Sequence, residues 1–170
     1  NFGEAGAFIR SSDDEALPDL QLHFVVGKLI DHGRKTVFGH GYSCHVCVLR
    51  PRSRGSLTLQ NKDPLAAPAI DIGFLNDRDD LERLVRGFKL MRKILQQPAL
   101  AGHGGRELDA SASAQTDEQI ERFMNKIAGT YEERFSAEAA NAYKQAGFGG
   151  ASGAAAFEKG RDPEQKPKLR

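Results

Sequence analysis

Cysteine and histidine, the residue types most used in metal and redox chemistry, gather in one short segment. Cys44 and Cys47 form a C-x-x-C motif with His45 between them, and His40 lies shortly before it. A zinc site needs about four converging ligands, and a redox motif needs a helix N-terminus. The segment has the pattern of a strand, in which residues three apart point to opposite faces. We therefore expect small-residue packing and no metal site, with a zinc module as the alternative that metal analysis would test.

His23 is the histidine best placed to bind a ligand. Residues 20–26 alternate as a strand does, which places His23 on the face opposite Leu22 and Phe24. An imidazole on such a face could line a pocket. The alternative is a surface histidine on the wet face of an antiparallel sheet. His103, in a glycine-rich loop, is expected to be exposed.

Two further motifs resemble ligand sites, but each has a plainer interpretation. The arginine cluster at positions 50, 52 and 54 could hold a phosphate or carboxylate, but solvated arginines are ordinary in a turn between strands. The glycine run at 147–153 departs from G-x-G-x-x-G because Ser152 stands in place of the third glycine. It also follows a helical pattern, so the strand-to-helix turn that binds a diphosphate is missing.

Composition excludes several classes of protein. The chain has 170 residues, with 24 Lys and Arg against 23 Asp and Glu. That balance argues against a nucleic-acid binder, and no apolar run approaches the roughly 20 residues that span a bilayer. Two cysteines fit a reducing compartment, so we expect a cytoplasmic protein. A strand-like pattern follows Asn1 directly with no visible signal peptide, which predicts that the chain starts within a larger protein.

The patterns predict an α+β domain, an antiparallel sheet backed by amphipathic helices. An apolar patch, Ala5 to Ile9, precedes three predicted strands at 20–26, 42–49 and 56–60. We expect the last two to pair across the short turn at 50–55.

Asp77 is the expected N-cap of the strongest helix, 77–97, which Pro98 should end. A capping box of Thr116 and Gln119 predicts a second helix that stops at Gly129. The remaining predicted segments are a third helix at 132–145 and a poorly ordered tail at 147–170.

Several segments in series resemble the glucose–methanol–choline (GMC) flavin oxidoreductases, most of all their choline and alcohol dehydrogenase branch. The segments are NFGEAGAFIR (1–10), PDLQLHF (18–24), HGYSCHVCVLRPRSRGSLTL (40–59), APAIDIGFL (67–75), DLERLVRGFKLMRKIL (80–95) and TDEQIERF (116–123). The resemblance implies two divisions of the chain, a partial GMC-like substrate-binding domain over residues 1–128 and a divergent Ala/Gly-rich helix with a charged tail over 129–170.

The resemblance also implies a function, the substrate side of an FAD-dependent enzyme that oxidises an alcohol or choline. An active-site histidine of choline-oxidising members falls on His23, and an aromatic wall of the substrate cavity falls on Phe2. An aromatic face attracts a quaternary ammonium group through cation–π interaction. The implied partners are a small alcohol substrate and a missing flavin domain, and no nucleic acid.

The chain departs from the family where the chemistry is done. The family continues after its helix with A-D-T-x-Y-H-P-V-G-T, whose histidine is the catalytic base, whereas here Glu132 and Glu133 follow Tyr131. The FAD-binding glycines are missing as well. We therefore expect no catalytic, cofactor-binding or metal-binding residues in this chain, no FAD bound to it alone, and no turnover by itself. The alternative is a non-catalytic remnant or binding domain.

Overall fold

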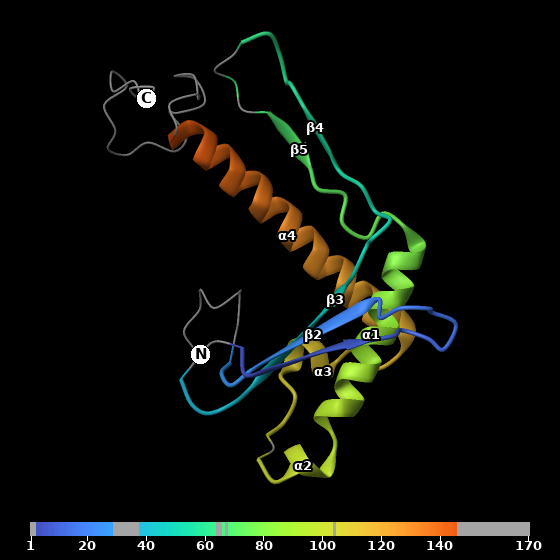
Figure 1. Cartoon of the computed structure of the whole chain (residues 1–170). Coiled ribbons are helices and arrows are strands. Elements are labelled where there is room, and N and C mark those ends of the chain that lie inside the picture. Colours follow the sequence, from blue (N-terminus) through green and yellow to red (C-terminus); the bar gives the residue numbers. More distant parts are fainter. Residues whose placement is uncertain (1–2, 29–37, 64–65, 67, 104, 146–170) are drawn as a thin grey trace. The chain divides into compact units, whose positions relative to one another are not determined.

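The computed structural model describes residues 3–28, 38–63, 66, 68–103 and 105–145 (Figure 1). Its elements are β1 (Ala5–Ile9), β2 (Leu20–Val25), β3 (Ser43–Val48), β4 (Ser56–Thr58), β5 (Ala69–Asp71), α1 (Arg78–Leu95), α2 (Pro98–Ala101), α3 (Asp109–Ala112) and α4 (Asp117–Gln145). Antiparallel strands together with helices confirm the predicted α+β class. The predicted tail lies outside the described residues.

The chain divides into two compact units. The first contains residues 1–52 and 75–126, and the second contains residues 53–74 and the chain from residue 127. In the first unit β1, β2 and β3 form an antiparallel sheet in that order. The register sets Leu22 of β2 opposite Ala7 of β1 and Val46 of β3. Partners in an antiparallel pair share a face, so these three side chains lie on one side of the sheet.

Helix α1 packs against that side of the sheet, as Figure 1 shows. Its apolar residues recur at spacings of three and four, which places them along one stripe. The stripe and the strand residues form the buried core: Leu22, Leu81, Val85, Phe88, Met91, Ala114, Ile120 and Met124. Asp77 caps the helix as predicted, because the Asp79 N–H donates to Asp77 Oδ1 at 2.9 Å. The helix ends at Leu95, before Pro98 as predicted, and Pro98 begins the short helix α2.

Gly87 marks the closest approach of α1 to the sheet. A Cβ atom at this position would lie 2.9 Å from Leu20 Cδ1 and 2.9 Å from Val46 Cγ2. Real carbon atoms do not approach so closely in well-packed interiors. Leu20 is fully buried, so the glycine permits a contact that any side chain would push apart.

A buried carboxylate holds together the loop between β1 and β2. Asp19 is 2% exposed, and it accepts hydrogen bonds from Ser11 N at 2.6 Å and Ser11 Oγ at 2.7 Å. The Asp19 carbonyl also accepts from the N–H of Leu49, at 2.7 Å, just after β3. Hydrogen bonds compensate the loss of solvation that burying a charge entails. Asp19 therefore links the end of β1, the start of β2 and the end of β3, which lie at the same end of the sheet.

Helix α4 begins with the predicted capping box and continues further than predicted. Gln119 N donates to Thr116 Oγ1 at 3.3 Å, and Thr116 N donates to Gln119 Oε1 at 3.0 Å. The helix runs unbroken through Gly129, so the predicted break there is wrong, and the predicted helix at 132–145 is its second half. One interior glycine costs a helix only about 1 kcal/mol relative to alanine, which good helix formers on both sides offset.

In the second unit β4 pairs with β5, with Leu57 opposite Ile70. The predicted pairing of segment 42–49 with segment 56–60 is therefore wrong, because β3 pairs with β2 instead. The chain leaves β3 with Arg50 in a left-handed conformation, at φ 53°. The Arg52 N–H then donates to Asp80 Oδ1 at 2.9 Å. These two features direct the chain to the start of α1 rather than into a tight hairpin.

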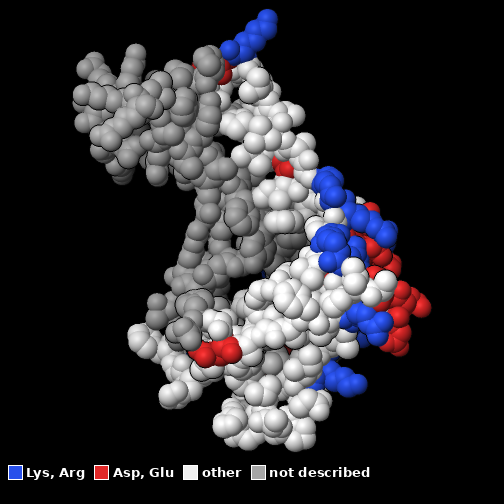
Figure 2. Space-filling view, in the orientation of Figure 1, with Lys and Arg blue, Asp and Glu red and all other residues white. Residues whose placement is uncertain are grey.

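Charges of both signs lie side by side over α1 (Figure 2). Arg78 bonds Glu121 at 2.6 and 2.8 Å, and Lys89 bonds Asp117 at 2.8 Å. These pairs join α1 to the first turns of α4. Within the described residues, no helix combines the length and the apolar character needed to cross a membrane.

The packing at Gly87 leads to the first testable prediction. We expect Gly87→Ala to lower the free energy of unfolding by about 1–2 kcal/mol, because overpacking outweighs the gain in helix propensity. Gly129→Ala is the matched control, since a Cβ there meets nothing within 4 Å. It should be neutral or stabilising by up to about 1 kcal/mol. Urea denaturation followed by circular dichroism measures both, and equal effects of the two substitutions would contradict this account of α1 packing.

Candidate functional site

The sheet face that points away from α1 carries the side chains able to do chemistry. Gly6, His23 and His45 are aligned across the three strands, and Phe8, Gln21 and Cys47 form the neighbouring row. Leu20 and Leu22, which alternate with these residues on β2, are buried. His23, His45 and Cys47 are exposed. We call this surface, defined by these two rows, the open sheet face.

The orientation of His23 agrees with the sequence-based expectation. Leu22 lies in the core with α1 and His23 lies on the opposite face. Leu22 and Phe24 alternate with His23, so both were expected to pack against the helix, but Phe24 is not part of the core cluster. Its ring lies against that of Tyr42, with centroids 5.4 Å apart. On β1 the partner of His23 is Gly6, which has no side chain to cover the imidazole. A substrate role for His23 is not tested by this geometry and stays a prediction.

Cys47 lies next to His23 on the open sheet face. Its Sγ atom lies 3.8 Å from His23 Nε2 and 3.7 Å from the carbonyl oxygen of Gln21. Cys44 points to the other face, where it packs against the core cluster. Both cysteines are free thiols. The C-x-x-C motif thus divides between two faces of the sheet, as the strand pattern predicted.

Partial loss of solvation governs the acidity of both thiols. Loss of solvation raises the pKa of the Cys47 thiol and the pKa of the Cys44 thiol above their ordinary values. A thiolate is the reactive form, and reactive cysteines have lowered pKa values. Neither thiol therefore has the electrostatic environment of a redox or nucleophilic cysteine.

The other residues considered from the sequence are held by their own chain or lie elsewhere. Arg50 donates from Nη2 to the Pro18 carbonyl at 2.7 Å, and Arg54 donates from Nη1 to the Ser53 carbonyl at 2.8 Å. His103 is exposed, as expected. Phe2 and the glycine run at 147–153 lie outside the described residues.

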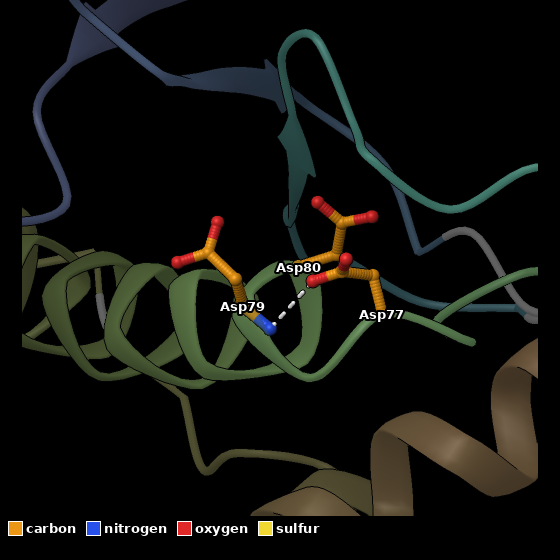
Figure 3. A group of neighbouring side chains, drawn as sticks. All are labelled: Asp77, Asp79 and Asp80. Carbon is orange, nitrogen blue, oxygen red and sulfur yellow. Dashed lines mark hydrogen bonds between the residues drawn. The ribbon is translucent and has the colours of Figure 1, made fainter.

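A group of three carboxylates at the start of α1 was not singled out as a site from the sequence. Asp77, Asp79 and Asp80 offer oxygen atoms within 4.8 Å of one another (Figure 3). Two of the three bind arginine, because Arg83 Nη2 lies 2.8 Å from Asp79 Oδ2 and 2.8 Å from Asp80 Oδ1. Asp77 is the helix cap. The cluster is therefore explained by helix capping and charge pairing, in which the positive end of the helix dipole also favours carboxylates.

Comparison with known proteins identifies relatives. The family model described as GMC oxidoreductase matches residues 51–137. The chain is 38% identical over 120 residues to an alcohol dehydrogenase (acceptor) of Pseudomonas putida, covering 71% of this chain and 22% of the relative. It is 36% identical over 130 residues to oxygen-dependent choline dehydrogenases of Escherichia coli, covering 76% of this chain and 23% of the relatives. The chain thus spans less than a quarter of the length of these curated relatives.

The buried pair of Asp80 and Arg83 leads to a second prediction. Asp80 is 1% exposed and Arg83 is 6% exposed. We expect Asp80→Ala to lower the free energy of unfolding by about 3 kcal/mol, because it leaves a buried guanidinium short of a partner. Glu82→Ala, which removes only a solvent-exposed ion pair with Arg78, should change it by less than about 1 kcal/mol. Urea denaturation compares the two, and a smaller loss for Asp80→Ala than for Glu82→Ala would refute the buried pair.

The raised thiol pKa values give a third prediction. Less thiolate is present at a given pH when the pKa is raised, so alkylation by iodoacetamide should be half-maximal above the value of about 8.5 for free cysteine. Cys47 should be modified before Cys44, because Cys47 is exposed whereas Cys44 packs against the core. Mass spectrometry of peptides from a pH series measures both rates, with urea-unfolded chain as control. A midpoint at or below that of the unfolded chain would contradict the assignment.

Proposed function

The chain belongs to the GMC oxidoreductase family, and on that premise we propose that it supplies the substrate-side domain of a longer FAD-dependent enzyme that oxidises the CH–OH group of an alcohol. The observation that carries the proposal is the open sheet face, which presents His23 while α1 covers the other face. The relatives named as alcohol and choline dehydrogenases support two substrate classes, neutral alcohols and choline.

We propose that this chain faces the flavin rather than holding its diphosphate. A diphosphate is usually bound at a glycine-rich turn that leads into a helix N-terminus. The chain contains no G-x-G-x-x-G sequence. The first turns of its two long helices are acidic, with Asp79 and Asp80 in α1 and Asp117 and Glu118 in α4, and these would repel phosphate. When bound by the longer enzyme, FAD would supply the acceptor for the hydride of the alcohol carbon.

His23 would bind and orient the alcohol. As the hydroxyl proton leaves, negative charge develops on the alcohol oxygen, and a positioned imidazole N–H can donate a hydrogen bond to that oxygen. The exposed ring of Phe8, in the row beside His23, would contact the carbon skeleton. Phe2, a substrate wall by resemblance, lies outside the described residues, and its cation–π contact with an ammonium group remains part of the proposal.

The proton acceptor would come from outside this chain. No histidine follows His103 in the sequence, so the segment after the family's helix lacks the base that its relatives are expected to have there. The domain boundary after residue 128 likewise remains a proposal, because α4 crosses it without interruption.

A non-catalytic binding domain is the second candidate function. Exposed large apolar side chains favour it, since Phe8 is 64% exposed, Leu57 67% and Leu59 83%. Such side chains often mark a surface that another protein covers. This candidate and the enzyme domain differ in what happens when a flavin domain is supplied, which is the basis of the test below.

The test is a graft, because the chain by itself is expected to show no turnover. The matched segment of this chain replaces the corresponding segment of the Pseudomonas putida relative, and alcohol oxidation is measured with a dye acceptor. We expect the graft to be active and His23→Ala to lower kcat/KM by about 10²–10³, the cost of one hydrogen-bond donor to a developing oxyanion. His103→Ala, at another exposed histidine, should stay within about twofold.

Three results would count against the proposal. Sustained turnover by the isolated chain with added FAD would show that it carries its own flavin site and base. A folded, FAD-loaded graft without activity would favour the binding-domain candidate. An active graft in which His23→Ala and His103→Ala behave alike would remove His23 from the substrate site.

A further inference from the structure

The thiol of Cys47 contacts two polar groups of β2 on the open sheet face, and one of them is the imidazole of His23. Its Sγ atom lies 3.7 Å from the carbonyl oxygen of Gln21 and 3.8 Å from His23 Nε2. Hydrogen bonds to sulfur are longer than those between nitrogen and oxygen, because the sulfur atom is larger. The register places Cys47 opposite Gln21 and diagonal to His23, so the pairing of β2 with β3 holds all three residues together.

The two contacts together determine which nitrogen of His23 carries the proton. A thiol has one hydrogen to donate, and its sulfur can also accept a hydrogen bond. The Gln21 carbonyl can only accept, so the Cys47 S–H donates to it. The sulfur is then the acceptor towards His23, and Nε2 must be the donor. In a neutral imidazole one nitrogen is the donor and the other is the acceptor, so Nδ1 has no hydrogen.

Cys47 can act in this way because its thiol keeps its proton. Loss of solvation raises the pKa of the thiol, so the S–H form dominates at neutral pH. A thiolate would have no hydrogen for the Gln21 carbonyl. On β1 the partner of His23 is Gly6, which has no side chain that could offer the imidazole a different hydrogen bond.

We propose that Cys47 is a positioning residue that keeps the proton of neutral His23 on Nε2, the nitrogen that would donate to the alcohol oxygen. The part of this proposal that concerns the alcohol rests on the proposed function. A thiol is a weak acceptor, whereas a developing alkoxide is charged, and hydrogen bonds to charged acceptors are about twice as strong as neutral ones. The same N–H would therefore pass from sulfur to the alcohol oxygen without a change of tautomer.

Nuclear magnetic resonance of the ring nitrogens tests the tautomer in the 170-residue chain itself. The chain carries isotope-labelled histidine and is measured at mildly alkaline pH, where imidazoles are neutral and the thiol is still protonated. The spectrum of His23→Asn identifies the signals of His23. We expect a pure Nε2–H pattern for His23 in the parent. Cys47→Ala should give ring-nitrogen signals averaged over both tautomers, as in the chain unfolded by urea.

Cys44→Ala is the matched control, because it removes the thiol on the opposite face and should keep the parent pattern. Circular dichroism shows whether each variant keeps the fold of the parent. An Nδ1–H pattern or averaged signals for His23 in the parent would overturn the proposal. A Cys47→Ala pattern identical to that of the parent would overturn it as well, since the tautomer would then not depend on the thiol.

A double-mutant cycle in the graft onto the Pseudomonas putida relative separates positioning from a merely structural role. Cys47→Ala should lower kcat/KM by about two- to tenfold, the effect of one ordinary hydrogen bond, and Cys44→Ala should leave it unchanged. In the His23→Ala graft, Cys47→Ala should cost nothing further, because the thiol acts through the imidazole. Equal losses in both backgrounds would overturn the positioning role. An inactive graft would count against the proposed function alone, because the tautomer is measured on the isolated chain.

Discussion

The packing of α1 on one side of the β1–β2–β3 sheet determines what the other side presents. Side chains alternate between the two faces of a strand, so burying Leu20 and Leu22 leaves Gln21 and His23 outside. The same argument on β3 turns Val46 and Cys44 inward and His45 and Cys47 outward. The chemistry of the open sheet face is therefore a consequence of core packing, and the tight contact at Gly87 constrains that packing.

Buried charges secure the edges of this arrangement. Asp19 anchors the loop between β1 and β2 and the residue that follows β3. Asp80 accepts hydrogen bonds from the Arg83 side chain and from the Arg52 backbone N–H. The second of these bonds joins the chain after β3 to the start of α1. Each carboxylate accepts several hydrogen bonds, the condition under which a buried charge is tolerated. Together they fix where the sheet ends and where α1 starts, and hence how the helix lies on the strands.

Features encoded by local patterns were predictable from the sequence, and features set by distant contacts were not. The apolar spacing and the Asp77 cap sufficed to predict α1, and the alternation in residues 20–26 sufficed to orient His23. The partner of β4 was predicted wrongly, because the contact between Arg52 and Asp80 that diverts the chain joins residues 28 positions apart. The helix break predicted at Gly129 was wrong because the free-energy cost of one glycine is small beside the cost of interrupting a long helix.

The contact between His23 and Cys47 is a further feature that the sequence did not reveal. Alternation shows which face a residue takes, but the cross-strand register decides which residues of two strands are neighbours. Here the register sets His23 beside His45 and diagonal to Cys47. The register therefore decides which side chains stand beside His23, and no local pattern in either strand shows it.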